Sequence, residues 1–192
     1  MKLILTSKDF LNEKSKKAIL DNLGNNIKNI KILFVPPAKA TKEELYSNKY
    51  QKRVMEYGFS KENIYILNYL EPDKSRNLNI DAIYVGGGNT FLLLDRLRKC
   101  GFDKDIINYV KSGVIYIGGS AGTHIVTKNI KHVLNFDTND VKMTNFKGLG
   151  LFDGIIICHY NQSREKILQS INSRYKIYTI KDDEYIIYVK WV

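Results

Sequence analysis

The chain has 192 residues, of which 44% are hydrophobic and 26% are charged, and this composition excludes collagen-like, mucin-like and wholly disordered proteins. The net charge is +10, from 30 Lys and Arg against 20 Asp and Glu. Because the basic residues are mostly lysines spread along the chain without a dense block, we expect no nucleic-acid partner.

Short apolar runs alternate with amphipathic stretches along the chain, which is typical of alternating strands and helices. Strands are predicted at residues 2–6, 31–35, 63–67, 80–85, 114–117, 155–158, 175–180 and 185–191. Helices are predicted at residues 12–23, 41–57, 90–99, 104–111, 121–127 and 163–173. Thr41 and Glu44 form a predicted capping box for the second helix. The pattern predicts one α/β domain, residues 1–192, with a mostly parallel sheet.

Two cysteines, Cys100 and Cys158, are too few for a disulfide scaffold, and their spacing does not suggest a metal site. We expect both to be reduced thiols packed near apolar neighbours. No apolar stretch approaches 18 residues, and the first apolar run is too short for a signal peptide. We therefore expect a cytoplasmic protein with no membrane partner.

Two glycine-rich turns follow predicted strands at their carboxyl ends, where ligands bind in open parallel sheets. Residues 118–122 read Gly-Gly-Ser-Ala-Gly, which fits G-x-S-x-G between a strand and a helix. This pattern is typical of a nucleophile elbow, which would expose the hydroxyl of Ser120 and direct the N–H of Ala121 at the same point. The alternative is a simple helix-start turn with Ser120 as the N-cap.

The other turn, residues 86–90, reads Gly-Gly-Gly-Asn-Thr. Its glycines allow close approach to a ligand, and the N–H of Gly88 or Asn89 would be a second oxyanion donor. Phosphate binding is the alternative, but the turn does not match G-x-G-x-x-G and no P-loop lysine follows it.

A serine nucleophile needs a base, and the chain has three histidines. His159 follows the predicted strand 155–158 and lies at the expected active-site edge. His124 shares a helix face with Ser120, but its side chain leans back towards its own helix. His132 lies in a polar segment and is expected to be exposed.

The residues alone do not identify the acid that would orient the base. Asp137 and Asp140 lie in the segment 135–145, which can fold back towards the site. Asp153 lies at the start of the strand that carries His159, and therefore at the wrong edge of the sheet.

These motifs together resemble the dipeptidase E (aspartyl dipeptidase) family of serine peptidases, which are related to class I glutamine amidotransferases. The resemblance runs from Leu3 to Tyr178 and rests on G-G-G-N-T, G-x-S-A-G, K-G-L-G-L-F-D and a strand ending in H-Y-N. It implies a flavodoxin-like three-layer α/β sandwich with a mostly parallel central sheet. It also implies hydrolysis of short peptides without a metal or cofactor.

The resemblance implies roles for particular residues. It makes Ser120 the nucleophile and His159 the base, with the amides of Gly88 and Ala121 as the oxyanion hole. The acid falls on Asp137 if a two-residue insertion in the loop is allowed; without it, Asn135 takes the position, and Asp140 remains a further candidate.

Two further residues are expected to bind substrate. Asn89 belongs to the first glycine turn, and Arg164 matches the arginine that meets the carboxylate of an amino-terminal aspartate in the family. We therefore expect a serine peptidase acting on short peptides, as a monomer or homodimer. The alternative is a weakly active or inactive binding module on the same fold, in which no carboxylate reaches His159.

Overall fold

The computed structural model describes residues 1–24 and 26–190. Six strands form a central sheet in the order β3-β2-β4-β5-β1-β8, and β6 pairs with β7 in a separate small sheet. The strands are β1 Lys2–Thr6, β2 Ile32–Val35, β3 Ile64–Ile66, β4 Ala82–Val85, β5 Ile115–Gly119, β6 Ile155–Ile157, β7 Ile177–Thr179 and β8 Tyr185–Val189.

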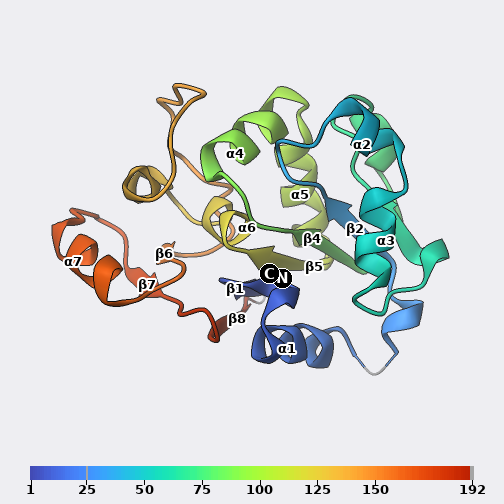
Figure 1. Cartoon of the computed structure of the whole chain (residues 1–192), viewed down its shortest axis with the longest axis horizontal. Coiled ribbons are helices and arrows are strands. Elements are labelled where there is room, and N and C mark those ends of the chain that lie inside the picture. The colour runs from blue at the N-terminus through green and yellow to red at the C-terminus, as the bar shows by residue number, and fades with distance from the viewer. Residues whose placement is uncertain (25, 191–192) are drawn as a thin grey trace.

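Helices lie on both sides of the central sheet, with α4 above it and α1 below it in the view of Figure 1. The α-helices are α1 Glu13–Leu23, α2 Lys42–Tyr46, α3 Lys49–Met55, α4 Thr90–Lys99, α5 Phe102–Lys111, α6 Ala121–Ile125 and α7 Gln162–Ser170. Among the described residues, no helix has the length and apolar character needed to cross a membrane.

The central sheet is parallel except at one edge. β1 pairs in parallel with β5, β4 with β5, and β2 with both β4 and β3, whereas β8 runs antiparallel to β1. The central strands are buried on both faces, as expected for a sheet covered by helices on each side. The predicted α/β class with a mostly parallel central sheet is confirmed.

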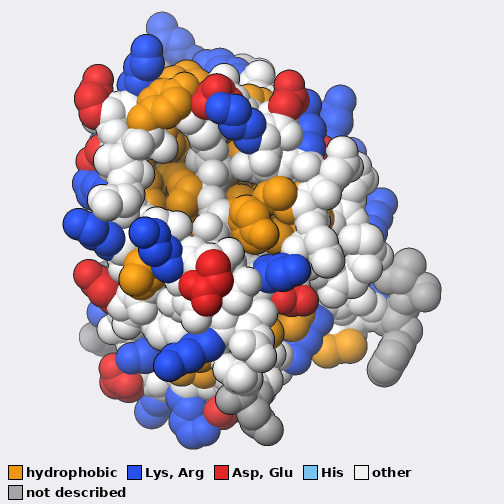
Figure 2. All heavy atoms as spheres, turned by 90° about the vertical axis from the view of Figure 1, so that its right-hand side faces the viewer, with side chains coloured by type: hydrophobic (Ala, Val, Ile, Leu, Met, Phe, Trp, Pro, Cys, Tyr) orange, Lys and Arg blue, Asp and Glu red, His pale blue; other side chains and the backbone are white. Residues whose placement is uncertain are grey.

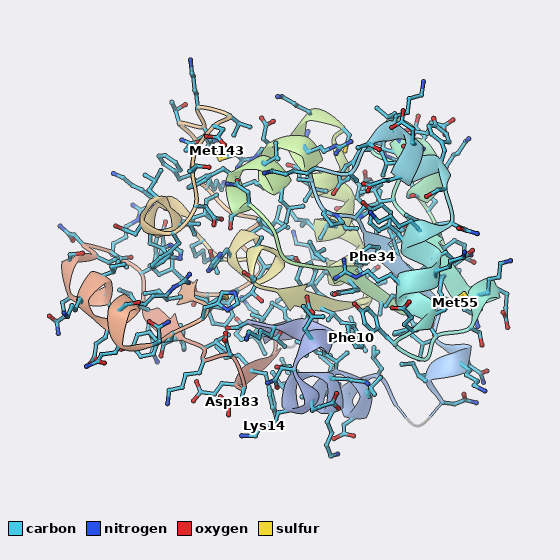
Figure 3. All side chains as sticks on the ribbon, viewed as in Figure 1. Phe10, Lys14, Phe34, Met55, Met143 and Asp183 are labelled. Atoms are coloured by element: carbon cyan, nitrogen blue, oxygen red, sulfur yellow. The ribbon has the colours of Figure 1, made fainter. Side chains whose placement is uncertain are left out.

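An aromatic cluster fills the core beneath the strand ends. The ring of Tyr84, on β4, has its centroid 5.1 Å from that of Phe10 and 5.0 Å from that of Phe34. Phe10, after β1, and Phe34, on β2, both contact the Tyr84 ring, and both are labelled in Figure 3. This packing anchors the segment after β1, which the site described below depends on.

Three predicted elements differ from the structure. The helix predicted at 41–57 is divided into α2 and α3, because Ser47 takes an extended conformation and its hydroxyl donates to the carbonyl of Glu44. The predicted capping box of Thr41 and Glu44 is confirmed. The strand that leads to His159 is β6, which lies outside the central sheet. Trp191, predicted as part of the last strand, lies outside the described residues.

On the face seen in Figure 2, the positive charge is not gathered into one patch. On the face that carries α2 and α3, Lys and Arg side chains are interspersed with Asp and Glu side chains (Figure 2). This arrangement agrees with the even spread of lysines along the sequence.

Candidate functional site

The chain turns sharply at Ser120, between β5 and α6. Ser120 has φ 48° and ψ −105°, a conformation that L-residues rarely adopt. Its N–H donates to the carbonyl of Thr6 at 3.0 Å, which fixes the bend against β1. Strained backbone of this kind is concentrated at functional sites, where the surrounding structure holds it in place.

Two glycines make this bend possible because the backbone approaches its neighbours too closely for a side chain. A Cβ at Gly122 would lie 2.0 Å from the carbonyl oxygen of Val85, and one at Gly118 would lie 3.0 Å from the backbone of Gly122. α6 therefore packs directly on the end of β4, and this contact fixes the position of Ser120.

We expect Gly122→Ala to destabilise the fold by about 3 kcal/mol, because the added Cβ overlaps rigid backbone. The measurement is the urea midpoint compared with wild type. Gly113→Ala is the control: its Cβ meets open space and only its φ of +109° is strained, so we expect a loss of about 1 kcal/mol. Equal losses for both variants would show that the close approach of α6 to β4 is not limiting.

The imidazole of His159 meets Ser120 at the bend. The distance from His159 Nε2 to Ser120 Oγ is 3.0 Å. His159 itself has φ 53°, and its N–H donates to the hydroxyl of Ser7 at 2.9 Å. The structure thus brings together the two residues that the sequence placed at one edge of the sheet.

The other nitrogen of His159 contacts a carboxylate that the sequence analysis did not select. Asp182 Oδ1 lies 2.6 Å from His159 Nδ1. Partial burial acts to raise the pKa of Asp182, but hydrogen bonds from Lys8 and His159 outweigh it and hold the pKa below its usual value. The carboxylate is therefore ionised at neutral pH and accepts a hydrogen bond from Nδ1–H of His159.

Two lysines hold the turn that carries Asp182. Lys8 Nζ lies 2.9 Å from Asp182 Oδ2, and Lys14 Nζ lies 2.8 Å from Asp183 Oδ2. Lys14 and Asp183 lie close together at the lower edge of the molecule in Figure 3. These contacts tie the turn between β7 and β8 to the segment that follows β1.

The prediction placed Asp137 on His159, and the structure differs. Asp137 Oδ2 instead accepts a hydrogen bond from the N–H of Thr90 at 2.7 Å, at the amino-terminal end of α4. A carboxylate is favoured there because the first N–H groups of a helix lack intrahelical partners. The two other candidates are also engaged elsewhere: Asn135 donates to the carbonyl of His132, and Asp140 accepts from the hydroxyl of Thr138.

A signal for Asp182 was present in the sequence. β6 and β7 are parallel, with Ile157 paired to Thr179, so both strands end at the same edge. His159 lies two residues beyond the end of β6 and Asp182 three residues beyond the end of β7. Recognising that the segments 155–158 and 175–180 pair with each other would have placed Asp182 beside His159.

The glycine turn at 86–90 lies beside Ser120. The Cβ of Ser120 is 3.5 Å from the position that a Cβ on Gly87 would occupy, and Gly88 has φ 134°. Asn89, predicted to bind substrate, has an engaged side chain: it accepts from the N–H of Leu92 and donates to the carbonyl of Thr138. It caps α4 and fixes the turn.

Arg164 lies in the first turn of α7 and reaches back to the residue before His159. Its guanidinium donates to the carbonyl of Cys158 and stacks on the ring of Phe136, with its Cζ 4.1 Å from the ring centroid. Both contacts orient the side chain. Arg164 is not among the residues that line the cavity at Ser120.

Cys158 does not contribute a nucleophile. Its thiol is fully buried beneath the bend, 3.8 Å from the carbonyl oxygen of Ser120. Burial raises its pKa to about 12, so the thiol stays protonated at neutral pH. This agrees with the expectation of a reduced, packed cysteine.

The two remaining histidines form a buried pair behind the site. His124 Nδ1 lies 3.2 Å from the hydroxyl of Thr90, and its Nε2 accepts from the N–H of Cys158 at 3.4 Å. His132 was predicted to be exposed, which is wrong. It is 6% exposed, and its Nε2 contacts the carbonyl of Ile156 at 2.8 Å. The ring centroids of the pair are 5.6 Å apart.

Burial makes the stability of the fold sensitive to mild acid. It lowers the pKa of His132 and lowers that of His124 well below its usual value, so the unfolded chain takes up protons first as the pH falls. The contribution of the neutral histidines to the free energy of unfolding is therefore fully present above about pH 6.5 and declines below it, with a limiting slope of about 1.4 kcal/mol per pH unit for each histidine that stays neutral in the fold. Urea unfolding between pH 7.5 and 5 measures this, and His132→Asn is expected to reduce the slope. A flat profile would contradict the prediction.

A cavity of about 360 Å³ opens beside Ser120 and His159. Its remaining lining residues come from the segment after β1, from α3 and from the first glycine turn: Ser7, Lys8, Asp9, Leu11, Arg53, Gly87 and Gly88. The hydroxyl, the imidazole and the glycine turn thus face one small space.

Comparisons with known proteins agree with this arrangement. Residues 3–190 match the model of peptidase family S51. The chain is 32% identical over 171 residues to the uncharacterized peptidase Lmo0363 of Listeria monocytogenes, covering 84% of this chain and 83% of that protein. It is 33% identical over 150 residues to peptidase E of Nostoc, covering 78% of this chain and 59% of that protein.

A solved structure shares the fold along nearly the whole chain. It is a crystal structure of a candidate peptidase E protein from Listeria monocytogenes, with a TM-score of 0.73 and 28% sequence identity, and the match covers 97% of each chain.

Proposed function

The chain belongs to peptidase family S51, and on this premise we propose that it is a serine peptidase that hydrolyses short peptides with Ser120 as its nucleophile. The observation that carries the proposal is the hydrogen-bonded row from Ser120 through His159 to Asp182, with distances of 3.0 and 2.6 Å. In this reading the bend at Ser120 is a nucleophile elbow.

The geometry supports an acyl-enzyme mechanism. Ser120 Oγ attacks the peptide carbonyl carbon while His159 Nε2 takes the hydroxyl proton. Asp182 holds the imidazole in the tautomer that has its proton on Nδ1, and stabilises the imidazolium that forms. His159 then protonates the leaving amine, and water attacks the acyl-enzyme in a second cycle that restores Ser120.

We assign the stabilisation of the oxyanion to the backbone N–H groups of Gly88 and Ala121. Among the described residues, none accepts a backbone hydrogen bond from either N–H. Both belong to the turns that meet at Ser120, so both are available to a negatively charged oxygen. Each such donor is worth about 2.7–4 kcal/mol of transition-state stabilisation in comparable sites.

The alternative, an inactive binding module, is less well supported. It requires that His159 lack a carboxylate partner, whereas Asp182 lies in hydrogen-bond contact with it. We therefore propose that the site is catalytically active. Asp182 then orients His159, the role predicted from the sequence for Asp137.

The preferred substrate is proposed to be a dipeptide with an amino-terminal aspartate. The resemblance to aspartyl dipeptidases supports this, as does the modest volume of the cavity, which suits short peptides better than long chains. Two arginines lie near the site: Arg164, whose guanidinium donates to the carbonyl of Cys158, and Arg53 in the cavity wall. Either guanidinium offers a planar fork for a carboxylate.

A dipeptide panel tests the proposal. Asp-Leu, Glu-Leu, Asn-Leu and Ala-Leu are compared by kcat/KM on wild type, Arg164→Ala and Arg53→Ala. We expect Asp-Leu to be hydrolysed fastest, and the variant lacking the carboxylate-binding arginine to lose rate on acidic substrates only. Equal rates on all four dipeptides would overturn the aspartate preference, and no hydrolysis of any would overturn the peptidase assignment to short peptides.

A further inference from the structure

A buried carboxylate that forms no direct ion pair with any described residue is part of the cavity wall, with the guanidinium of Arg53 as a nearby positive charge. Asp9 begins the short 3-10 helix Asp9–Leu11 directly after β1, at φ 41°. It is only 4% exposed, and no residue within 1–24 and 26–190 donates a hydrogen bond to its Oδ1. An unpaired buried acceptor is costly, so a ligand that satisfies it would bind favourably.

The carboxylate of Asp9 lies against both glycine turns. Its Oδ2 is 2.2 Å from the position that a Cβ on Gly119 would occupy and 3.8 Å from that of a Cβ on Gly86. Gly119 immediately precedes Ser120, and both Asp9 and Ser120 line the same cavity. The absence of a side chain at Gly119 is what admits the carboxylate at this point, whereas the spacing to Gly86 is an ordinary van der Waals contact.

Two cations of the cavity wall near Asp9 are held by other residues. Burial raises the pKa of Asp9, while Tyr84 and Arg53 act to lower it. Arg53 donates its Nε proton to the hydroxyl of Tyr57 at 3.0 Å, and Lys8 is paired with Asp182. An ammonium group placed at Oδ1 would compensate the buried charge and favour its ionised form.

A metal ion is a poor match for this position. No group of three or more His, Cys, Asp or Glu side chains suited to a metal exists within the described residues. A single ammonium needs fewer acceptors than a metal ion needs ligands.

We propose that Asp9 binds the free α-ammonium group of the substrate's amino-terminal residue, so that the peptidase acts only on peptides with an unblocked amino terminus. The α-nitrogen of such a residue is two bonds from the carbonyl carbon that Ser120 attacks. Its acceptor must therefore lie within about one residue's length of Ser120, and Asp9 lines the same cavity and packs against Gly119, the residue before Ser120. This inference rests on the proposed peptidase function and adds a binding residue to it.

The backbone at Asp9 does not depend on its carboxylate. Its N–H donates to the hydroxyl of Thr6 at 2.9 Å, and Phe10 is held in the aromatic cluster around Tyr84. Asp9→Asn keeps the size and shape of the side chain, removes the charge and replaces one acceptor oxygen by an NH2 donor. Asp21→Asn, which breaks an exposed pair with Lys17 on α1, is the matched control.

The test compares Asp-Leu with N-acetyl-Asp-Leu on wild type, Asp9→Asn and Asp21→Asn. We expect wild type to hydrolyse the free dipeptide and to act on the acetylated one at least 10-fold more slowly. Asp9→Asn should lose about 10- to 100-fold in kcat/KM on the free dipeptide, chiefly through KM, and change little on the acetylated one. Equal losses on both substrates would indicate a structural role and overturn the proposal.

A binding measurement separates this proposal from the failure of the peptidase function and needs no folded Asp9 variant. Calorimetry on Ser120→Ala compares the affinity for Asp-Leu and N-acetyl-Asp-Leu without turnover. Tighter binding of the free dipeptide, by about 10-fold or more, is expected. Equal affinities would overturn the role of Asp9 even if wild type is an active peptidase, whereas discrimination without hydrolysis by wild type would overturn only the catalytic assignment.

Discussion

Ser120→Ala is expected to lower kcat on the best dipeptide by roughly 10⁴- to 10⁶-fold, because the variant has no oxygen to form the acyl-enzyme. His159 and Asp182 cannot replace the lost hydroxyl, although the cavity and the backbone amides remain. Initial rates at saturating substrate measure the effect.

Covalent labelling gives an independent readout for this variant. A fluorophosphonate reacts with an activated serine, so wild type should be labelled at Ser120 and Ser120→Ala should not be labelled. The thermal unfolding midpoint serves as the control, and it should change little because alanine at position 120 keeps the backbone contact with Thr6. Labelling that persists in Ser120→Ala would contradict the assignment of the nucleophile.

Asp182→Asn is expected to lower kcat by about 10²- to 10⁴-fold, with little change in KM. An amide at this position can donate to Nδ1 and so favour the wrong imidazole tautomer, and it cannot stabilise the imidazolium. The loss should fall towards the lower end of the range, because Asp182 is half-exposed and water can partly replace it.

Asp137→Asn is the matched comparison, because it changes the carboxylate that the sequence favoured. Its partner is the N–H of Thr90, so we expect a small loss of stability and a change in kcat of less than about 10-fold. A large loss of kcat in Asp137→Asn together with a near-normal Asp182→Asn would show that Asp137 is the acid in the working enzyme.

The part of the site that could be predicted is the part encoded locally. Gly118, Ser120 and Gly122 lie within five residues between a strand and a helix, so the bend follows from steric limits on a short segment. His159 directly follows an apolar run, and strand ends of an α/β fold gather at one edge. Such inferences need no knowledge of which strands are neighbours.

Asp182 and His132 could not be identified in that way, because their surroundings depend on long-range pairing. The position of Asp182 follows from the parallel pairing of β6 with β7, two strands of three residues each. The burial of His132 follows from its contact with the carbonyl of Ile156, 24 residues later. Runs this short do not reveal their partners, and a polar sequence around a histidine does not report what packs over it.

The pairing of β6 with β7 also makes the geometry of the site independent of the chain that connects these two strands. Since Ile157 and Thr179 are locked in register, His159 and Asp182 keep their relative placement whatever the length of chain that connects them. The connecting stretch contains α7, in which no residue is buried. Lengthening it after Arg164, whose contacts with Cys158 and Phe136 would be kept, would cost mainly loop-closure entropy. The segment between β6 and β7 is therefore where residues that contact substrate can change without altering the hydrogen bonds among Ser120, His159 and Asp182.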